Sequence, residues 1–240
     1  MVDAANSKVS DTSDPWAIYE ATRDRLIALV RSLDDEVAAS SVPLTPDWTV
    51  VEVLSHVCGL TADVAAGMRT GLGTPDRTRH QVAVRSGDSI DEICDEWMST
   101  SGAMREAMRD DAFFGHRLTA DLTTHLHDVQ HAVGDPVDCD DRATRAAAHT
   151  YGRVVTDLLR ERTGVALRVE LTDGTTFAPT DADDTDLTVA ATPFDFLRTA
   201  TGRRSIAEVR ALDWSADPDA VLAHLSPYGP LRDTDAGFDR

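Results

Sequence analysis

The spacing of apolar residues predicts a series of amphipathic helices from about residue 14 to residue 163. Apolar positions recur at helical intervals in five segments, and each stripe is expected to face a common core. The predicted helices span about 14–33, 49–69, 89–109, 117–133 and 142–163. The connection at 70–87 contains Gly, Pro and Arg and is expected to be a loop, either a functional one or a plain exposed link.

Local signals mark several ends of these helices. Thr49-Val50-Val51-Glu52 has the spacing of a capping box, in which the Thr side chain and the Glu side chain each satisfy a free backbone amide. Gly134 and Gly164 follow the last apolar positions of the fourth and fifth helices, where C-terminal caps are expected. The second, fourth and fifth helices therefore have at least one defined end.

The hydrophobic period changes from helical to alternating after Gly164. Leu167, Val169 and Leu171 alternate as in a strand, and Asp173-Gly174 is a hairpin-turn signal. A second strand is expected at about 186–190, followed by short helices at about 193–201, 204–211 and 217–225. This order predicts an α+β protein: a disordered N-terminus at 1–13, a helical bundle at 14–163 and a small α/β domain at 164–240.

Charge and composition narrow the classes of partner. The formal net charge of −19 argues against nucleic acid and anionic membrane surfaces. Three cysteines without close spacing argue against a disulfide framework. No apolar run is long enough for a membrane span, and the polar first fifteen residues lack the features of a signal peptide. We expect a cytoplasmic protein, a monomer or homodimer, that acts on a small molecule.

The fourth predicted helix carries the strongest chemical signal. His125 falls within its apolar stripe, and Asp121, one turn earlier, falls on the edge of that stripe. Burying a carboxylate beside an imidazole is costly unless a partner satisfies both, and a divalent metal ion does so. His56, at the edge of the apolar stripe of the second helix, is the best candidate for a third ligand. The spacing alone also allows simpler interpretations, in which Asp121 pairs with His125 or His125 bonds to the backbone.

Several other side chains have a functional or a structural interpretation. Asp128 either orients His125 from behind or bonds to a neighbouring loop. Arg203 and Arg204 either hold a carboxylate of a substrate or thiol, or simply begin a solvated helix. Cys58 is interpreted as a small core residue and Trp48 as a core or cap residue.

Two segments resemble a known family. Residues 48–59, WTVVEVLSHVCG, resemble the motif W-T-V-x-E-V-L-x-H-x-x-G, and residues 121–134, DLTTHLHDVQHAVG, resemble a second motif of the same family. Residues 186–190 and the later GRRS at 202–205 resemble its small C-terminal domain. The family is that of the mycothiol-dependent maleylpyruvate isomerases, within the DinB-like superfamily. The resemblance extends from about residue 14 to residue 231.

This resemblance implies a fold, a metal site and an activity. The implied fold is a DinB-like up-and-down four-helix bundle with a small α/β domain. His56, Asp121 and His125 would bind a divalent metal, zinc in particular, although Asp121 stands where the isomerase has Glu. The metal would hold mycothiol or another low-molecular-weight thiol as a thiolate, which attacks a small electrophile such as maleylpyruvate.

Three functions remain distinct at this point. The first is a thiol-dependent S-transferase or isomerase. The second is a non-catalytic DinB-like protein that binds a metal or a small molecule in a stress response. The third is a metal-dependent hydrolase in which water takes the place of the thiol. Both enzyme hypotheses need an open coordination position, whereas the binding protein does not.

Overall fold

The chain is an α+β protein, as the order of its elements predicted. The structure is a computed structural model that describes residues 14–180 and 184–235, so the N-terminal segment expected to be disordered lies outside the described residues. The chain divides between Val137 and Asp138 into two compact units. The N-terminal unit is a helical bundle, and the C-terminal unit is a small sheet with helices.

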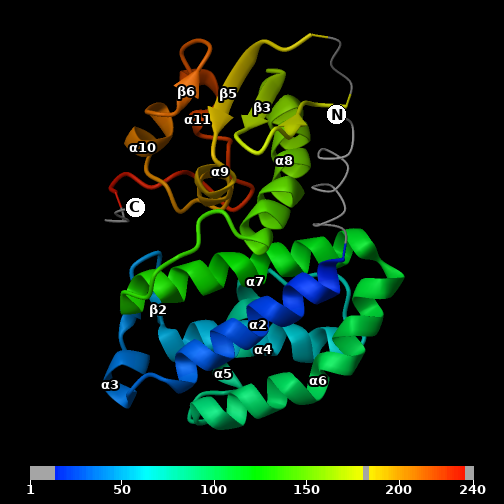
Figure 1. Cartoon of the computed structure of the whole chain (residues 1–240), viewed down its shortest axis with the longest axis vertical. Helices are drawn as coiled ribbons and strands as arrows, with labels where there is room; N and C mark the ends of the chain where they lie inside the picture. Colours follow the sequence, from blue (N-terminus) through cyan, green and yellow to red (C-terminus); the bar gives the residue numbers. More distant parts are fainter. Residues whose placement is uncertain (1–13, 181–183, 236–240) are drawn as a thin grey trace, which may run out of the picture. The chain divides into compact units, whose positions relative to one another are not determined.

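The N-terminal unit is an up-and-down bundle of four long helices. Figure 1 shows them together with two short helices and a two-stranded hairpin. The elements are α2 (Pro15–Arg31), α3 (Asp35–Ala38), β1 (Ser41–Val42), β2 (Thr45–Thr49), α4 (Val50–Ala65), α5 (Pro75–Ala83), α6 (Ile90–Asp110) and α7 (Ala112–Val133). Helix α4 packs against α6 and α7, and α2 packs against α7 and α6. The bundle core is therefore shared by all four long helices.

The segment 70–87 differs from its prediction as a loop, because it contains helix α5. Pro75 occupies the first turn, where its fixed backbone angle suits a helix start. Gln81 is the one buried residue of this helix. With no apolar stripe to bury, α5 gives no hydrophobic period, which explains why the periodicity did not reveal it.

Helix α7 begins five residues earlier than the predicted start near residue 117. Asp111 separates it from α6 and adopts an extended conformation. The Asp111 carboxylate accepts a hydrogen bond of 3.0 Å from the backbone N–H of Phe114 and thereby caps α7. One residue is thus enough to reverse the chain between the two helices.

A buried hydrogen-bond network fixes three helices of the bundle against one another. The hydroxyl of Tyr19 on α2 lies 2.7 Å from that of Thr61 on α4, and Nε1 of Trp97 on α6 donates to Tyr19 at 3.0 Å. Apolar residues such as Leu26 and Leu54 surround the network and are fully buried. Because buried polar groups need specific partners, the network favours one arrangement of α2, α4 and α6.

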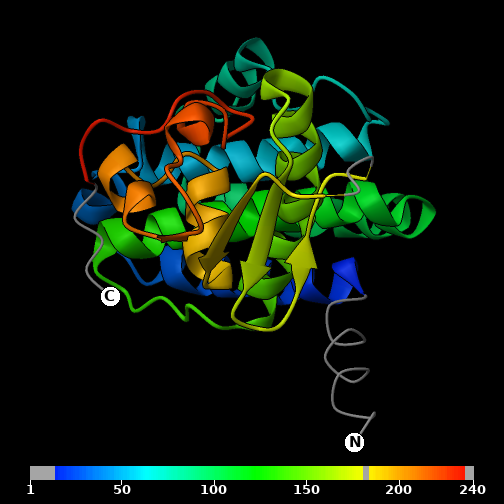
Figure 2. The ribbon, with the colours of Figure 1, turned by 90° about the horizontal axis from the view of Figure 1, so that it is seen from above.

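The C-terminal unit is built on a four-stranded mixed sheet with strand order β4-β3-β5-β6. Figure 2 shows its longer strands side by side. Strands β3 and β5 are parallel, with Leu167 opposite Leu187, and the outer strands are antiparallel to them. The elements are α8 (Arg142–Thr163), β3 (Leu167–Leu171), β4 (Thr176–Phe177), β5 (Leu187–Ala191), α9 (Pro193–Ala200), α10 (Ile206–Arg210), β6 (Asp213–Trp214) and α11 (Asp219–Leu222).

The division between the units precedes the expected boundary at residue 164. Helix α8 was placed in the bundle by its periodicity, but it packs against α9, β3 and β4 of the C-terminal unit. Its buried residues Tyr151, Val155 and Leu159 belong to that unit. Periodicity identifies a helix and its buried face but not the elements that cover that face. For this reason the expected boundary at residue 164 differs from the division observed after Val137.

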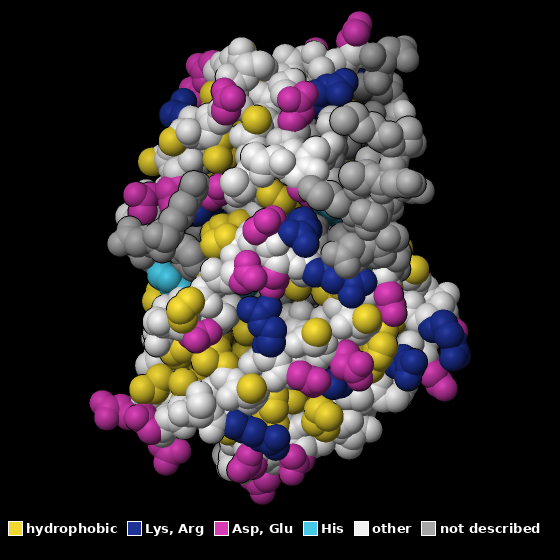
Figure 3. Space-filling view, viewed as in Figure 1, with side chains coloured by type: hydrophobic (Ala, Val, Ile, Leu, Met, Phe, Trp, Pro, Cys, Tyr) yellow, Lys and Arg dark blue, Asp and Glu magenta, His cyan; other side chains and the backbone are white. Residues whose placement is uncertain are grey.

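Two surface properties bear on the expected partners. None of the helices in the described ranges is long and apolar enough to cross a membrane. On the face shown in Figure 3, acidic and basic side chains are interspersed with apolar ones and do not gather into a basic patch.

Gly152 on α8 allows Phe177 of β4 to pack directly on the helix. A Cβ at this position would lie 2.6 Å from Phe177 Cε2. We predict that Gly152→Ala lowers the free energy of unfolding by about 1–3 kcal/mol, because the phenyl ring must move. Gly102 on α6 is the matched control, since a Cβ there meets nothing within 4 Å. Gly102→Ala should raise stability by up to about 1 kcal/mol through helix propensity. Urea denaturation of both variants tests this, and equal stabilisation would contradict the packing argument.

Candidate metal centre

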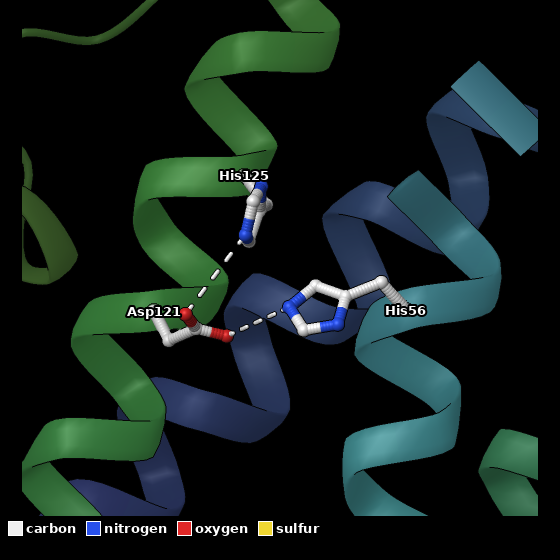
Figure 4. A group of neighbouring side chains, drawn as sticks. All are labelled: His56, Asp121 and His125. Atoms are coloured by element: carbon white, nitrogen blue, oxygen red, sulfur yellow. Dashed lines mark ion pairs between the residues drawn. The ribbon is translucent and has the colours of Figure 1, made fainter. Parts of the chain in front are cut away.

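Helices α4 and α7 bring together the three side chains that the sequence nominated. His56 extends from α4, and Asp121 and His125 extend from adjacent turns of α7 (Figure 4). The predicted capping box fixes the start of α4: Glu52 accepts a hydrogen bond of 2.8 Å from the backbone N–H of Thr49. His56 lies two turns after this fixed end, which places it opposite α7.

The two histidines approach the same carboxylate from different sides. His56 Nε2 lies 3.9 Å from Asp121 Oδ2, and His125 Nε2 lies 3.8 Å from Asp121 Oδ1. One ligand atom from each of the three residues lies within 4.8 Å of the other two. The imidazole rings are 5.1 Å apart and nearly perpendicular. Two nitrogens and a carboxylate oxygen therefore surround one point.

These distances bear on the simpler interpretations of the sequence, in which Asp121 pairs with His125 or His125 bonds to the backbone. A nitrogen–oxygen hydrogen bond is about 2.7–3.2 Å long, so at 3.8 Å Asp121 and His125 are not hydrogen-bonded to each other. His125 Nδ1 is buried and, among the described residues, has no hydrogen-bond partner of good geometry, backbone included. Asp121 lies within ion-pair distance of both histidines (Figure 4), and a metal ion between the three residues stays a prediction.

The donor set fits a divalent ion such as zinc. Zinc accepts imidazole nitrogen and carboxylate oxygen at about 2.0–2.2 Å, which holds tetrahedral ligand atoms roughly 3.4 Å apart. The observed separations of 3.8 and 3.9 Å exceed that value by less than a carbon–carbon bond length. His56 and His125 are buried, whereas the Asp121 side chain is 31% exposed. If all three residues hold an ion, the exposed side of Asp121 would leave a position for a further ligand.

Asp128 lies behind His125, as one of its two interpretations predicted. Its side chain is fully buried, and Oδ2 is 3.4 Å from His125 Nδ1. A carboxylate in this position orients a metal-binding imidazole and favours the tautomer whose Nε2 lone pair faces the ion. At 3.4 Å the two atoms are within ion-pair distance, and the orienting role of Asp128 stays a prediction.

Two residues near the histidines were not nominated as site residues by the sequence. The ring of Trp48, at the end of β2, lies 5.1 Å from that of His56 and 6.1 Å from that of His125. Gln81 of α5 places Oε1 2.8 Å from His56 Nδ1. The motif containing Trp48 was a usable signal for the first residue. No local pattern marked the second, because its role depends on a contact between helices.

Arg203 and Arg204 lie in the C-terminal unit, on the turn before α10. Arg204 is 8% exposed and forms ion pairs with Asp195 at 2.6 Å and Glu208 at 2.5 Å. Arg203 is partly exposed and donates to the carbonyl of Thr201 at 2.6 Å. The Arg204 guanidinium is thus neutralised within its own unit. Binding of a substrate or thiol carboxylate by this pair stays a prediction. Arg203 is the better candidate of the two, because Arg204 already pairs with two carboxylates.

Comparison with known proteins adds a family match and a fold. The family described as "Mycothiol maleylpyruvate isomerase N-terminal domain" matches residues 19–113, a segment that contains His56 and ends before Asp121. No curated protein sequence matches the chain significantly.

Two solved structures share the fold of the chain. One is the mycothiol-dependent maleylpyruvate isomerase, at 15% identity and a TM-score of 0.52, and the other is a histidine-to-alanine mutant of that enzyme, at 14% and 0.53. Each alignment covers 86% of this chain and 93% of the other. Together with the family match, this likeness confirms the resemblance predicted from the sequence: residues 19–113 match the N-terminal domain of the mycothiol maleylpyruvate isomerases, and the chain shares the fold of a solved member.

Proposed function

We propose that the chain is a metal-dependent enzyme that uses mycothiol, or a similar low-molecular-weight thiol, either to isomerise a small electrophile or to transfer the thiol sulfur to it. The observation that carries the proposal is the convergence of His56, Asp121 and His125 on one point with one partly open side. The family match supports the choice of thiol, and the number of ligands supports catalysis over a closed structural site.

Each ligand has a separate task in this proposal. His56 and His125 supply neutral nitrogen donors, and Asp121 supplies the negative charge between them. A divalent ion held there supplies Lewis acidity, which lowers the pKa of a thiol and favours its thiolate near neutral pH. Trp48 provides an aromatic wall beside both histidines, and this wall limits the access of water to that side.

The cysteines of the N-terminal unit are poor sources of the reactive sulfur. Burial raises the pKa of Cys58 to about 12, and the opposing effect of Arg85 does not offset it. Burial likewise raises the pKa of Cys94 to about 11. Both therefore remain protonated near neutral pH, and protonated thiols are weak nucleophiles. A thiol cosubstrate fills the role that these residues cannot.

The proposed substrate is a small molecule with an activated double bond, such as maleylpyruvate. The thiol sulfur adds to the double bond, the resulting single bond rotates, and departure of the sulfur restores the double bond and returns the thiol unchanged. A substrate with a leaving group would instead retain the sulfur, which gives S-transfer. We expect this chemistry in the cytoplasm, where thiols are kept reduced.

The first prediction concerns metal content. The wild-type chain, loaded with zinc and dialysed, should retain about one ion, because three ligands define one site. His125→Ala should lose it, whereas His80→Ala, which removes an exposed histidine of α5, should retain it. Elemental mass spectrometry measures all three. A wild-type chain without metal, or equal loss in both variants, would overturn the proposed centre.

The second prediction concerns thiol dependence. The zinc-loaded chain should convert maleylpyruvate only when mycothiol is present, which the loss of maleylpyruvate absorbance reports. His56→Ala should reduce the rate to that without protein, because a ligand is removed from the centre. S-methylated mycothiol should give no reaction, because its sulfur cannot become a thiolate. Metal binding without any effect of thiol would favour the hydrolase or the binding protein instead.

The third prediction concerns pH and the native cysteines. A thiol whose pKa is raised holds less thiolate at every pH below that value, so Cys58 and Cys94 should resist iodoacetamide near neutral pH. Cys139, which is partly exposed, should react first. Above neutral pH, labelling of the native buried thiols should rise about tenfold per pH unit. Peptide mass spectrometry follows each site, with denatured protein as the control. Equal rates at Cys58 and Cys139 would contradict the assignment of the two pKa values.

A further inference from the structure

Helix α5 connects His56 to a series of hydrogen-bonded polar side chains, Gln81, Asp63 and Arg77, which we call the relay. Gln81 is 1% exposed and places Oε1 2.8 Å from His56 Nδ1. Gln81 Nε2 donates to Asp63 Oδ2 at 2.7 Å, and Arg77 Nε donates to the same oxygen at 2.7 Å. The second Asp63 oxygen also pairs with Arg77. The relay thus runs from Arg77 through Asp63 and Gln81 to His56.

The direction of each hydrogen bond follows from the arginine. A guanidinium only donates, and Asp63, paired with it as a carboxylate, only accepts. Gln81 must therefore turn its NH₂ group toward Asp63, where the carbonyl of Leu72 accepts a second bond at 3.4 Å. Gln81 Oε1 then faces His56, and an amide oxygen only accepts. His56 Nδ1 has to carry a proton.

We propose that Gln81 is a positioning residue that fixes neutral His56 in the tautomer protonated at Nδ1, so that the Nε2 lone pair faces Asp121 and His125. This inference rests on the proposed metal centre and deepens it. Only an unprotonated ring nitrogen binds a metal, so the relay from Arg77 selects the nitrogen that points into the site. Neutral imidazole in water favours the opposite tautomer, with the proton on Nε2. The relay therefore has to reverse the intrinsic preference of the ring.

The backbone of α5 is held close enough for this contact. Gly59 lies one turn after His56 on α4, and a Cβ there would be 2.6 Å from Gln81 Cβ. Arg85 donates to the Gln81 carbonyl at 2.8 Å, and its Nε donates to Glu96 of α6 at 2.8 Å. The absence of a side chain at Gly59 and the anchor at Arg85 together let Gln81 reach the imidazole.

The direct test needs no substitution. In the metal-free, ¹⁵N-histidine-labelled full chain at about pH 8, above the ordinary pKa of histidine near 6.5, long-range ¹H–¹⁵N spectra distinguish the two neutral tautomers. The His56 signal is the one missing from His56→Ala among the eight histidines. We expect it to show the proton on Nδ1. A proton on Nε2 in the wild type would overturn the proposal, whatever the metal content of the protein.

A substitution tests the consequence for metal binding. Gln81→Met keeps the length of the side chain but removes the acceptor, so His56 should move toward the tautomer protonated at Nε2. Zinc affinity, measured by competition with a chromogenic chelator, should fall about 10–100-fold, as is usual for the loss of a group behind a metal ligand. Gln81→Glu, with its second carboxyl oxygen protonated toward Asp63, keeps an acceptor opposite Nδ1 and should preserve the Nδ1–H tautomer.

Gln130→Met is the matched control. Gln130 is 3% exposed, and its amide donates to Asp135 at 2.7 Å without an observed contact to His56. The Gln130→Met variant should lose a buried amide hydrogen bond but keep nearly the same affinity for zinc. Equal losses of affinity in Gln81→Met and Gln130→Met would reduce Gln81 to a structural residue and overturn the proposal.

Failure of the underlying metal centre gives a different result. A wild-type chain that binds no zinc refutes the proposed function, but the tautomer of His56 is still measured directly. A wild type that binds zinc while Gln81→Met binds it equally well refutes the role of Gln81 alone.

Discussion

The convergence of two buried imidazoles and a partly exposed carboxylate between α4 and α7 is the constraint on which the N-terminal unit depends. Such groups are costly in a protein interior unless each has a partner, and here the three groups are too far apart to satisfy one another. The ion proposed at their centre would offset this cost. Gln81 lies 2.8 Å from His56 Nδ1 and Asp128 lies 3.4 Å from His125 Nδ1, and we propose that these two groups set which nitrogen of each ring faces the centre.

The position of α4 in the bundle is fixed by specific polar contacts as well as by the packing of its hydrophobic stripe. Its start is fixed by the capping box at Thr49, and its middle is tied to α2 and α6 through Thr61. Helix α5 approaches across Gly59 and reaches the far side of His56. Each contact restrains the helix at a different point along its length, so the position of His56 follows from the packing of the whole unit. A binding site built on rigid helices loses little free energy to ordering when its ligand arrives.

The sequence predicted the parts of this arrangement that depend on local pattern. Helical periodicity placed Asp121 and His125 on one face of α7, and a recognisable motif added His56 from α4. Helix α5 was predicted as a loop because Gln81 is its one buried residue, so it has no stripe to detect. The relay through Gln81 and the packing partners of α8 depend on contacts between elements distant in sequence, which no local pattern records. The sequence therefore nominated the three candidate ligands but not Gln81, the residue proposed to orient one of them.

X-ray absorption at the zinc edge tests the central claim most directly. In the zinc-loaded chain, the account predicts a first shell of nitrogen and oxygen at about 2.0–2.2 Å with the outer-shell pattern of two imidazoles. Addition of mycothiol should introduce one sulfur neighbour at about 2.3 Å. A spectrum without imidazole would contradict the assignment of the ligands. A first shell that mycothiol leaves unchanged would contradict the open position on which the proposed thiol chemistry depends.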